Sequence, residues 1–341
     1  MPSLRPLLAP LIASLGLSAL PAHAEVELLA SIKPLQLIAG AVQAGIDEPG
    51  LLLPAGASPH HYSLRPSDVR QLRQADLFYW IGPDLESFLA KPLDGRDGPA
   101  LAVQTLPGLT LRHFGEHGHG HADESHEAHE HEHEHEHEHE EHAHDDHEAH
   151  GEHDHAHRPG SLDAHLWLDP HNARVIARRM AADLAEVDPA NAQRYQANLK
   201  AFEQRLDALD TQLKQSLAAV EAVPFFVFHE TYDYFEAAYG LEHTGVFALG
   251  EVQPGARQVA DMRERLREAG PSCVFSEPPV RPRLTETLTE GLPVRLAELD
   301  AMGLDLPADA NGYPRLLERL AAGLSRCLTA VAEQAGQPKN Q

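Results

Sequence analysis

Cysteine is scarce in this sequence: the 341 residues include two, Cys273 and Cys327. A structural zinc site usually takes its thiolates from close pairs such as C-x-x-C, so two cysteines this far apart argue against one. In an exported chain, which the first 24 residues indicate, an even pair is most simply a disulfide. Two free thiols, or a thiolate metal site, are the alternative interpretations.

Basic residues are also in deficit. The chain has 27 Lys and Arg against 52 Asp and Glu, a formal net charge of −25. Without a basic patch to neutralise phosphates, nucleic-acid binding is not expected. Long apolar runs are missing too: beyond the N-terminus, none approaches the roughly eighteen residues that indicate a transmembrane helix, so we expect the mature chain to be soluble.

The N-terminus has the features of a secretory signal peptide. Arg5 precedes an apolar run over residues 7–20, and the small residues Ala22 and Ala24 follow it. This pattern predicts a signal peptide over residues 1–24 that is cleaved before Glu25. The mature protein is therefore expected in the periplasm.

Residues 113–157 differ from the rest of the chain in composition. They contain 18 His and 16 Asp or Glu, with no Lys or Arg and almost no apolar side chain. Such a segment cannot bury enough surface to offset its ordering entropy, which predicts a disordered His- and acid-rich insertion. Weak binding of several metal ions to these imidazoles and carboxylates is expected, and the sequence leaves its role open.

Outside the insertion, short apolar runs alternate with helix-compatible stretches. Predicted strands cover residues 26–32, 51–53 and 77–81 in the first half and 225–228, 244–247, 273–276 and 294–299 in the second; predicted helices cover 34–44, 66–74, 258–269 and 284–291. Strands that alternate with helices indicate parallel sheets covered on both faces. The predicted fold class is α/β, with two (β/α) lobes at residues 25–188 and 221–341.

A single long helix is predicted between the lobes, over residues 189–220. Its apolar side chains recur at steps of three and four: Tyr195, Leu199, Phe202, Leu206, Leu209, Leu213 and Leu217. This spacing places them on one stripe of a helix roughly 48 Å long. A coiled coil is the alternative, but a rigid rod along both lobes is the preferred interpretation, because the opposite face offers few matched charge pairs.

Six histidines lie outside the signal peptide and the insertion, and three of them lie in or directly after apolar segments. His60 and His229 come after predicted strands, and His165 precedes Asp169 and Pro170, which predict a helix start. In open α/β sheets, ligands bind at the carboxyl ends of the strands. These three imidazoles are therefore predicted to share one cleft between the lobes.

Asp300 ends another predicted strand, in the second lobe. Three neutral imidazoles and one carboxylate form a ligand set that suits Zn²⁺. The remaining histidines are weaker candidates: His61 is expected at the rim of the site, His171 on the exposed first turn of a helix, and His243 has no feature that favours metal binding.

At these residues the sequence resembles the zinc-specific substrate-binding proteins of bacterial ABC importers, the ZnuA type. The matching segments are GASPHHYSLRPSD at 56–68, DAHLWLDP at 163–170, FHETYDYF at 228–235, FSEP at 275–278 and Leu299-Asp300. The resemblance implies two lobes bridged by one long helix, zinc held between them by His60, His165, His229 and Asp300, and a disulfide similar to Cys273–Cys327. Related manganese binders typically have Glu where this chain has His229. Pro59 stands where some members have Glu, so Asp300 or a water is left as the fourth ligand.

The expected function is high-affinity capture of Zn²⁺ in the periplasm and its delivery to an inner-membrane ABC permease, by a monomer without enzymatic activity. One alternative is a stand-alone periplasmic zinc buffer or an adhesin-like surface protein. A zinc hydrolase with Glu230 or Glu277 as general base is the other. Against the hydrolase, Asp300 would close the open coordination position that catalysis needs, and no G-x-S-x-G motif occurs.

Overall fold

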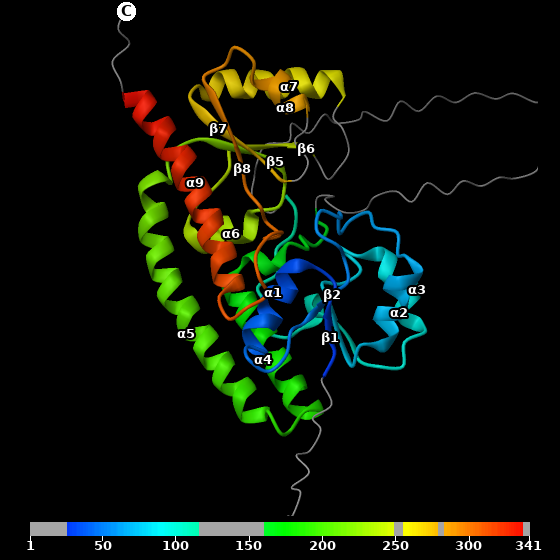
Figure 1. The fold of residues 1–341 in the computed structure, drawn as a ribbon. Coiled ribbons are helices and arrows are strands. Elements are labelled where there is room, and N and C mark those ends of the chain that lie inside the picture. Colours follow the sequence, from blue (N-terminus) through cyan, green and yellow to red (C-terminus); the bar gives the residue numbers. More distant parts are fainter. Residues whose placement is uncertain (1–25, 116–159, 249–254, 279–282, 337–341) are drawn as a thin grey trace, which may run out of the picture.

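The computed structural model describes residues 26–115, 160–248, 255–278 and 283–336, as drawn in Figure 1. The predicted signal peptide and nearly all of the predicted insertion lie outside these ranges. Within them, no helix is both long and apolar enough to cross a membrane.

The N-terminal lobe is built on a four-stranded parallel sheet with the order β2-β1-β3-β4. Its strands are β1 (Leu28–Ala30), β2 (Gly50–Leu51), β3 (Leu77–Trp80) and β4 (Ala100–Ala102). Its helices are α1 (Lys33–Val42), α2 (Pro66–Gln74) and α3 (Ala90–Asp94), with short 3-10 helices at Ser87–Leu89 and Val103–Thr105. Three strands match the sequence prediction, while β4 was not predicted.

The C-terminal lobe repeats this plan, with the parallel order β6-β5-β7-β8. Its strands are β5 (Phe225–His229), β6 (Gly245–Ala248), β7 (Ser272–Ser276) and β8 (Val294–Glu298). Its helices are α6 (Asp233–Tyr239), α7 (Ala256–Ala269) and α8 (Arg283–Thr289). The predicted α/β class with two parallel sheets is confirmed.

Two antiparallel helices join the lobes. α4 (Pro170–Val187) begins as the sequence indicates, because the Asp169 side chain accepts a hydrogen bond from the His171 backbone N–H at 2.7 Å and Pro170 occupies the first turn. α5 (Ala192–Leu217) follows and ends in the 3-10 turn Ala218–Val220. All seven apolar residues of its predicted stripe are buried. In Figure 1, α5 runs alongside both lobes.

A second long helix, α9 (Gly312–Gly336), was not predicted. It packs against α5, against α1 of the first lobe and against β7 and β8 of the second. Cys327 of α9 forms a disulfide with Cys273 of β7, with an S–S distance of 2.04 Å and a Cα–Cα distance of 6.3 Å. The predicted disulfide is confirmed, and it ties the second sheet to a helix that also contacts the first lobe.

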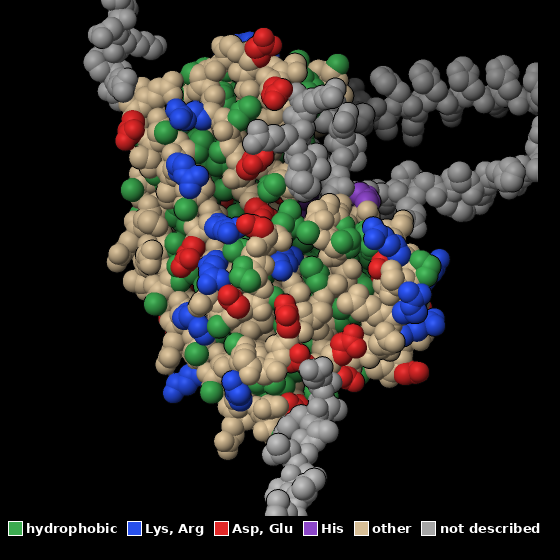
Figure 2. Space-filling model, in the orientation of Figure 1, with side chains coloured by type: hydrophobic (Ala, Val, Ile, Leu, Met, Phe, Trp, Pro, Cys, Tyr) green, Lys and Arg blue, Asp and Glu red, His purple; other side chains and the backbone are tan. Residues whose placement is uncertain are grey.

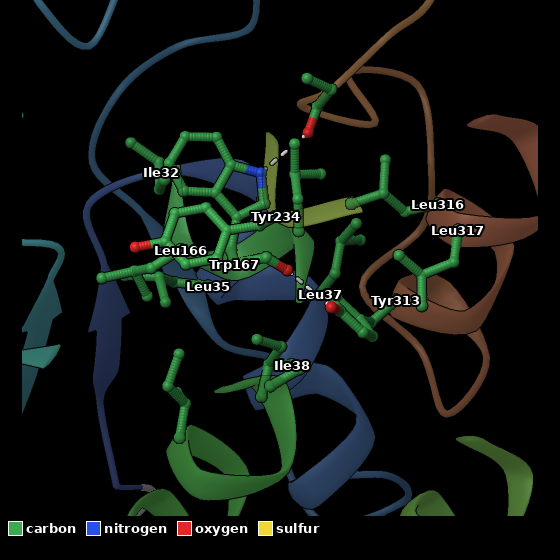
Figure 3. Packing of buried hydrophobic residues seen from close by; sticks show 14 of the residues in the cluster. Ile32, Leu35, Leu37, Ile38, Leu166, Trp167, Tyr234, Tyr313, Leu316 and Leu317 are labelled. Atoms are coloured by element: carbon green, nitrogen blue, oxygen red, sulfur yellow. Dashed lines mark hydrogen bonds between the residues drawn. The ribbon is translucent and has the colours of Figure 1, made fainter. Parts of the chain in front are cut away.

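The main hydrophobic core is continuous across the two lobes. Figure 3 shows its centre, where Trp167 lies among side chains of α1, α6 and α9. The Trp167 indole N–H donates to the Ala301 carbonyl at 3.0 Å, and the Tyr313 hydroxyl donates to the Trp167 carbonyl at 2.6 Å. At Gly40 of α1, an added Cβ would lie 2.3 Å from the Ala308 carbonyl oxygen, so glycine lets the loop before α9 approach this closely.

Candidate metal centre

His60, His165 and His229 meet between the lobes. Each offers a ring nitrogen that lies within 4.8 Å of the others'. The ring centroids are 5.6 Å apart for His60 and His165, 5.4 Å for His60 and His229, and 5.2 Å for His165 and His229. An ion with bonds of about 2.0–2.1 Å to nitrogen holds two ligand atoms at most about 4.2 Å apart, so the rings lie close to the spacing that one ion needs. The structure thus brings together the three histidines that the sequence singled out.

The fold brings these three residues from separate segments to the boundary between the two lobes, which we call the seam. His229 is the last residue of β5, the strand between β6 and β7. His60 lies in the loop that follows β2, where its backbone N–H donates to the Ser58 hydroxyl at 3.2 Å. His165 immediately precedes the 3-10 helix Leu166–Leu168. Two of the ligand candidates therefore belong to the first lobe and one to the second.

The imidazoles lie mostly in the interior. His165 is 2 % exposed, while His60 and His229 are partly buried. On the face shown in Figure 2, histidine atoms are visible in a small patch beside the grey segments, and acidic and basic side chains are interspersed over most of the surface. Water is therefore partly excluded from the site, which favours an ion held by its protein ligands.

A buried carboxyl group contacts the imidazole of His165. Asp163 Oδ1 lies 2.7 Å from His165 Nδ1 and also accepts the His165 backbone N–H at 2.9 Å. Asp163 is 1 % exposed. Its burial raises the pKa of its carboxyl group, and the negative charge of Asp233 adds to this shift. Positive charge placed near His165 would therefore favour the ionised form of Asp163.

A hydroxyl group contacts the imidazole of His229. Thr231 Oγ1 lies 2.6 Å from His229 Nδ1 and donates to Glu277 Oε1 at 2.7 Å. Glu277 Oε1 is also 3.3 Å from His229 Nδ1. The sequence did not indicate these contacts of Asp163 and Thr231, although each residue stands two positions from a predicted ligand.

Asp300 has a different setting from the three histidines. In the described residues, the group of side chains close enough to share an ion comprises His60, His165 and His229, without Asp300. Asp300 Oδ1 accepts the backbone N–H groups of Met302 and Gly303, and Oδ2 accepts that of Leu304, at 2.8–3.0 Å. Its carboxylate thus stabilises the turn after β8, a role that the sequence did not indicate.

The other three histidines lie outside this site. His61 is exposed, with its ring centroid 6.4 Å from that of His60. His171 Nε2 is 2.9 Å from the Gly108 carbonyl oxygen. His243 is 2 % exposed and packs against α6, where its Nδ1 lies 2.9 Å from Glu236 Oε2 and 3.8 Å from Asp233 Oδ1.

His243, which the sequence left without a role, is part of a buried ion pair. Burial by itself lowers the pKa of His243, but the charges of Glu236, Asp233 and Glu230 outweigh this and raise it to about 9. These three acidic residues could in principle join the imidazole around a metal ion, and Asp233 and Glu236 lie close enough. The negative charges that raise the pKa of His243 favour a proton on its ring.

This ion pair predicts a loss of stability at alkaline pH. The pKa of His243 is higher in the folded chain, about 9, than the ordinary value of about 6.5 expected on unfolding. Protonation therefore stabilises the fold fully below about pH 6.5, and the contribution, about 3 kcal/mol, is lost as pH rises through about 9. Urea unfolding of the wild type and His243→Asn between about pH 6.5 and 9.5 measures this.

The variant should show a flatter pH profile than the wild type over that interval. Among the acids facing His243, Glu230 has a pKa raised to about 7, chiefly by burial, so most of its own titration falls before the alkaline half of the window. Parallel profiles for the two proteins would contradict a charged His243.

Comparison with known proteins gives an independent result. The family model of ZnuA, the periplasmic component A of a zinc-uptake complex, matches residues 28–327. The high-affinity zinc uptake system protein ZnuA of Brucella suis biovar 1 is 40 % identical over 302 residues, covering 88 % of this chain and 90 % of the relative. The protein of the same name from Yersinia pestis is 35 % identical over 309 residues, covering 89 % and 92 %.

Solved structures share the fold. A crystal structure of ZnuA superposes with a TM-score of 0.68 at 22 % identity, covering 89 % of this chain and 99 % of the other. A laminin-binding adhesin of Streptococcus agalactiae gives 0.67 at 19 % identity, covering 89 % and 100 %. From the matched family model and the relatives together, the chain belongs to the ZnuA family of periplasmic zinc-uptake components.

Proposed function

We propose that this chain is the periplasmic zinc-binding component of an ABC importer, which captures Zn²⁺ between its lobes and delivers it to an inner-membrane permease. The observation that carries this proposal is the meeting of His60, His165 and His229 at one point. The relatives are zinc-uptake proteins by name, and the family is a binding component of a transport system. It is not a family of enzymes, which argues against the hydrolase alternative.

The ligand chemistry supports zinc. Imidazole nitrogens suit Zn²⁺, whereas oxygen-rich sets suit Mn²⁺ and Mg²⁺. In this proposal the three histidines hold the ion and Asp300 supplies the fourth ligand. Within the described residues, Asp300 Oδ2 accepts one hydrogen bond, so a lone pair is left for a metal. A zinc-loaded crystal structure distinguishes this carboxylate from a water in the fourth position.

The proposed route includes export and limited lobe motion. Residues 1–24 would direct export as a signal peptide, and the mature chain would act as a monomer with lobes 25–188 and 221–341 around the linking helix 189–220. α9 contacts both lobes and α5 packs on both α1 and α6. Since two long helices cross the seam, small tilts rather than wide hinge closure would accompany loading and release.

Transport is tested in cells and with purified components. In a strain that lacks its own zinc-binding component and carries the cognate permease, this chain should restore growth under zinc starvation. The zinc-loaded chain should also stimulate ATP hydrolysis by the reconstituted permease more than the zinc-free chain does. A chain that binds zinc but does neither would be a stand-alone buffer.

A further inference from the structure

We propose that Asp163 and the Thr231–Glu277 pair are positioning residues, which hold the proton of His165 and of His229 on Nδ1 and so present Nε2 of both rings to the metal ion. This inference rests on the proposed function, because it explains how the site is prepared for zinc. The two histidines belong to different lobes, and each is oriented by its own neighbours.

For His165, the direction of the hydrogen bond follows from Asp163 Oδ1. This oxygen accepts the His165 backbone N–H at 2.9 Å. In the proposed arrangement His165 Nδ1, at 2.7 Å, is the second donor to the same oxygen, which then accepts from both the ring and the backbone of His165. Because Asp163 is 1 % and His165 2 % exposed, water has little access to replace this bond.

For His229, the direction follows from Glu277. The Thr231 hydroxyl has one proton, and it donates that proton to Glu277 Oε1 at 2.7 Å. Toward His229 the hydroxyl can offer only a lone pair, so Nδ1, at 2.6 Å, must be the donor. Thr231 is 1 % exposed, whereas the Glu277 side chain is 29 % exposed.

The opposite lobe also holds the segment that contains Asp163. The Tyr234 hydroxyl of α6 donates to the Asp163 carbonyl oxygen at 2.9 Å and accepts the Arg112 backbone N–H at 2.9 Å. A residue of the second lobe thus fixes the two chain segments beside His165 in the first. The orientation of His165 consequently depends on the position of the second lobe relative to the first.

Fixing the proton on Nδ1 matters because a metal binds only the unprotonated ring nitrogen. In a free imidazole either nitrogen can carry the proton. An acceptor behind Nδ1 selects the tautomer, restrains the ring and raises the basicity of Nε2. Loss of such a partner typically lowers metal affinity about 10–100-fold.

Thr231 offers a matched set of variants for the test. Thr231→Val removes the hydroxyl at nearly constant shape, and Thr231→Ser keeps it. Competition titration of the full chain with a zinc chelator should show about 10–100-fold weaker binding at the tight site for Thr231→Val and near-wild-type binding for Thr231→Ser. Thr289→Val, a similar buried change at a hydroxyl on α8 that bonds the Thr285 carbonyl, controls for general loss of packing.

A second measurement reports the tautomer directly and without zinc. In ¹⁵N-histidine-labelled chain, NMR should detect protected Nδ1–H protons on His165 and His229, assigned by their loss in His165→Gln and His229→Gln. Thr231→Val should abolish the His229 signal while leaving that of His165, and Asp163→Ala should do the reverse. A purely structural role for Thr231 would not move a proton between ring nitrogens.

The inference is overturned if Thr231→Val binds zinc as tightly as the wild type, or if the zinc-free wild type carries its protons on Nε2. Failure of the proposed function would look different. In that case the wild type would show no tight zinc site that depends on the three histidines, whatever the tautomers are.

Discussion

Replacing His229 with alanine should weaken binding at the tight zinc site by about a hundredfold or more. Structural zinc sites bind their ion with apparent free energies of about 10–16 kcal/mol. Shared among the four proposed ligands, this is several kcal/mol for each. His229 is the one imidazole of the proposed site that the second lobe supplies, so its loss would leave Asp300 as the remaining proposed ligand from that lobe. Competition titration with a chelator of known affinity measures the effect.

His171→Ala is the matched control, because it removes an imidazole that lies outside the site. It should leave the tight site unchanged. Residues 113–157 contribute 18 further histidines. These histidines are expected to bind further zinc ions weakly. With limiting zinc the tight site fills first, so its affinity is measured separately from theirs. An unaltered first equivalent in His229→Ala would refute the proposed ligand set.

Removing the disulfide should lower the free energy of unfolding by about 4 kcal/mol. Cys273 and Cys327 are 54 positions apart, and closing a loop of this length restricts the unfolded chain by about that amount in the chain-entropy model. The double variant Cys273→Ala, Cys327→Ala removes the bond without leaving a reactive thiol. Urea unfolding of the zinc-free protein under non-reducing conditions measures the change.

Reduction of the wild type provides the control for this effect. Under reducing conditions its stability should fall toward that of the double variant, since the crosslink is then absent from both proteins. Both cysteines are buried, at 0 % and 6 % exposed, so a small additional loss from packing is expected in the variant. Equal midpoints for the oxidised wild type and the variant would contradict the prediction.

Most of the secondary structure could be read from local patterns. The helices α3, α6 and α9 and the strand β4 were not predicted, and the omissions of β4 and α9 have physical reasons. β4 consists of Ala100–Ala102 at the edge of its sheet and carries a single large apolar side chain. α9 contains Gly323, which weakens a helical pattern; an added Cβ there would lie 2.7 Å from a methyl carbon of Leu299. The buried residues Leu316, Leu320 and Leu324 still repeat at helical spacing and could have revealed α9.

The sequence predicted which histidines lie close together, but it did not predict the hydrogen bonds of the candidate ligands. His60 and His229 follow predicted strands and His165 lies in a short apolar segment before a helix start, so their common position could be inferred from the edge at which parallel strands end. The hydrogen bonds to their Nδ1 atoms could not be inferred in this way. Whether Asp163 accepts from His165, or Thr231 from His229, depends on side-chain orientations that no periodicity encodes. Asp300 illustrates the same limit, because its contacts with three backbone N–H groups arise from the path of one turn.

Local chemistry in the chain was enough to predict two parallel sheets, a long amphipathic helix, the start of α4 at Asp169 and Pro170, and three histidines at strand or segment ends. Those features depend on residues within a few positions of one another. The folded chain alone shows the packing of α9 across both lobes, the acidic residues around His243 and the contacts of Asp163 and Thr231 with the imidazoles. Each of these depends on distances between atoms that the linear order does not specify, such as the contact of Tyr234 with Arg112, 122 positions away.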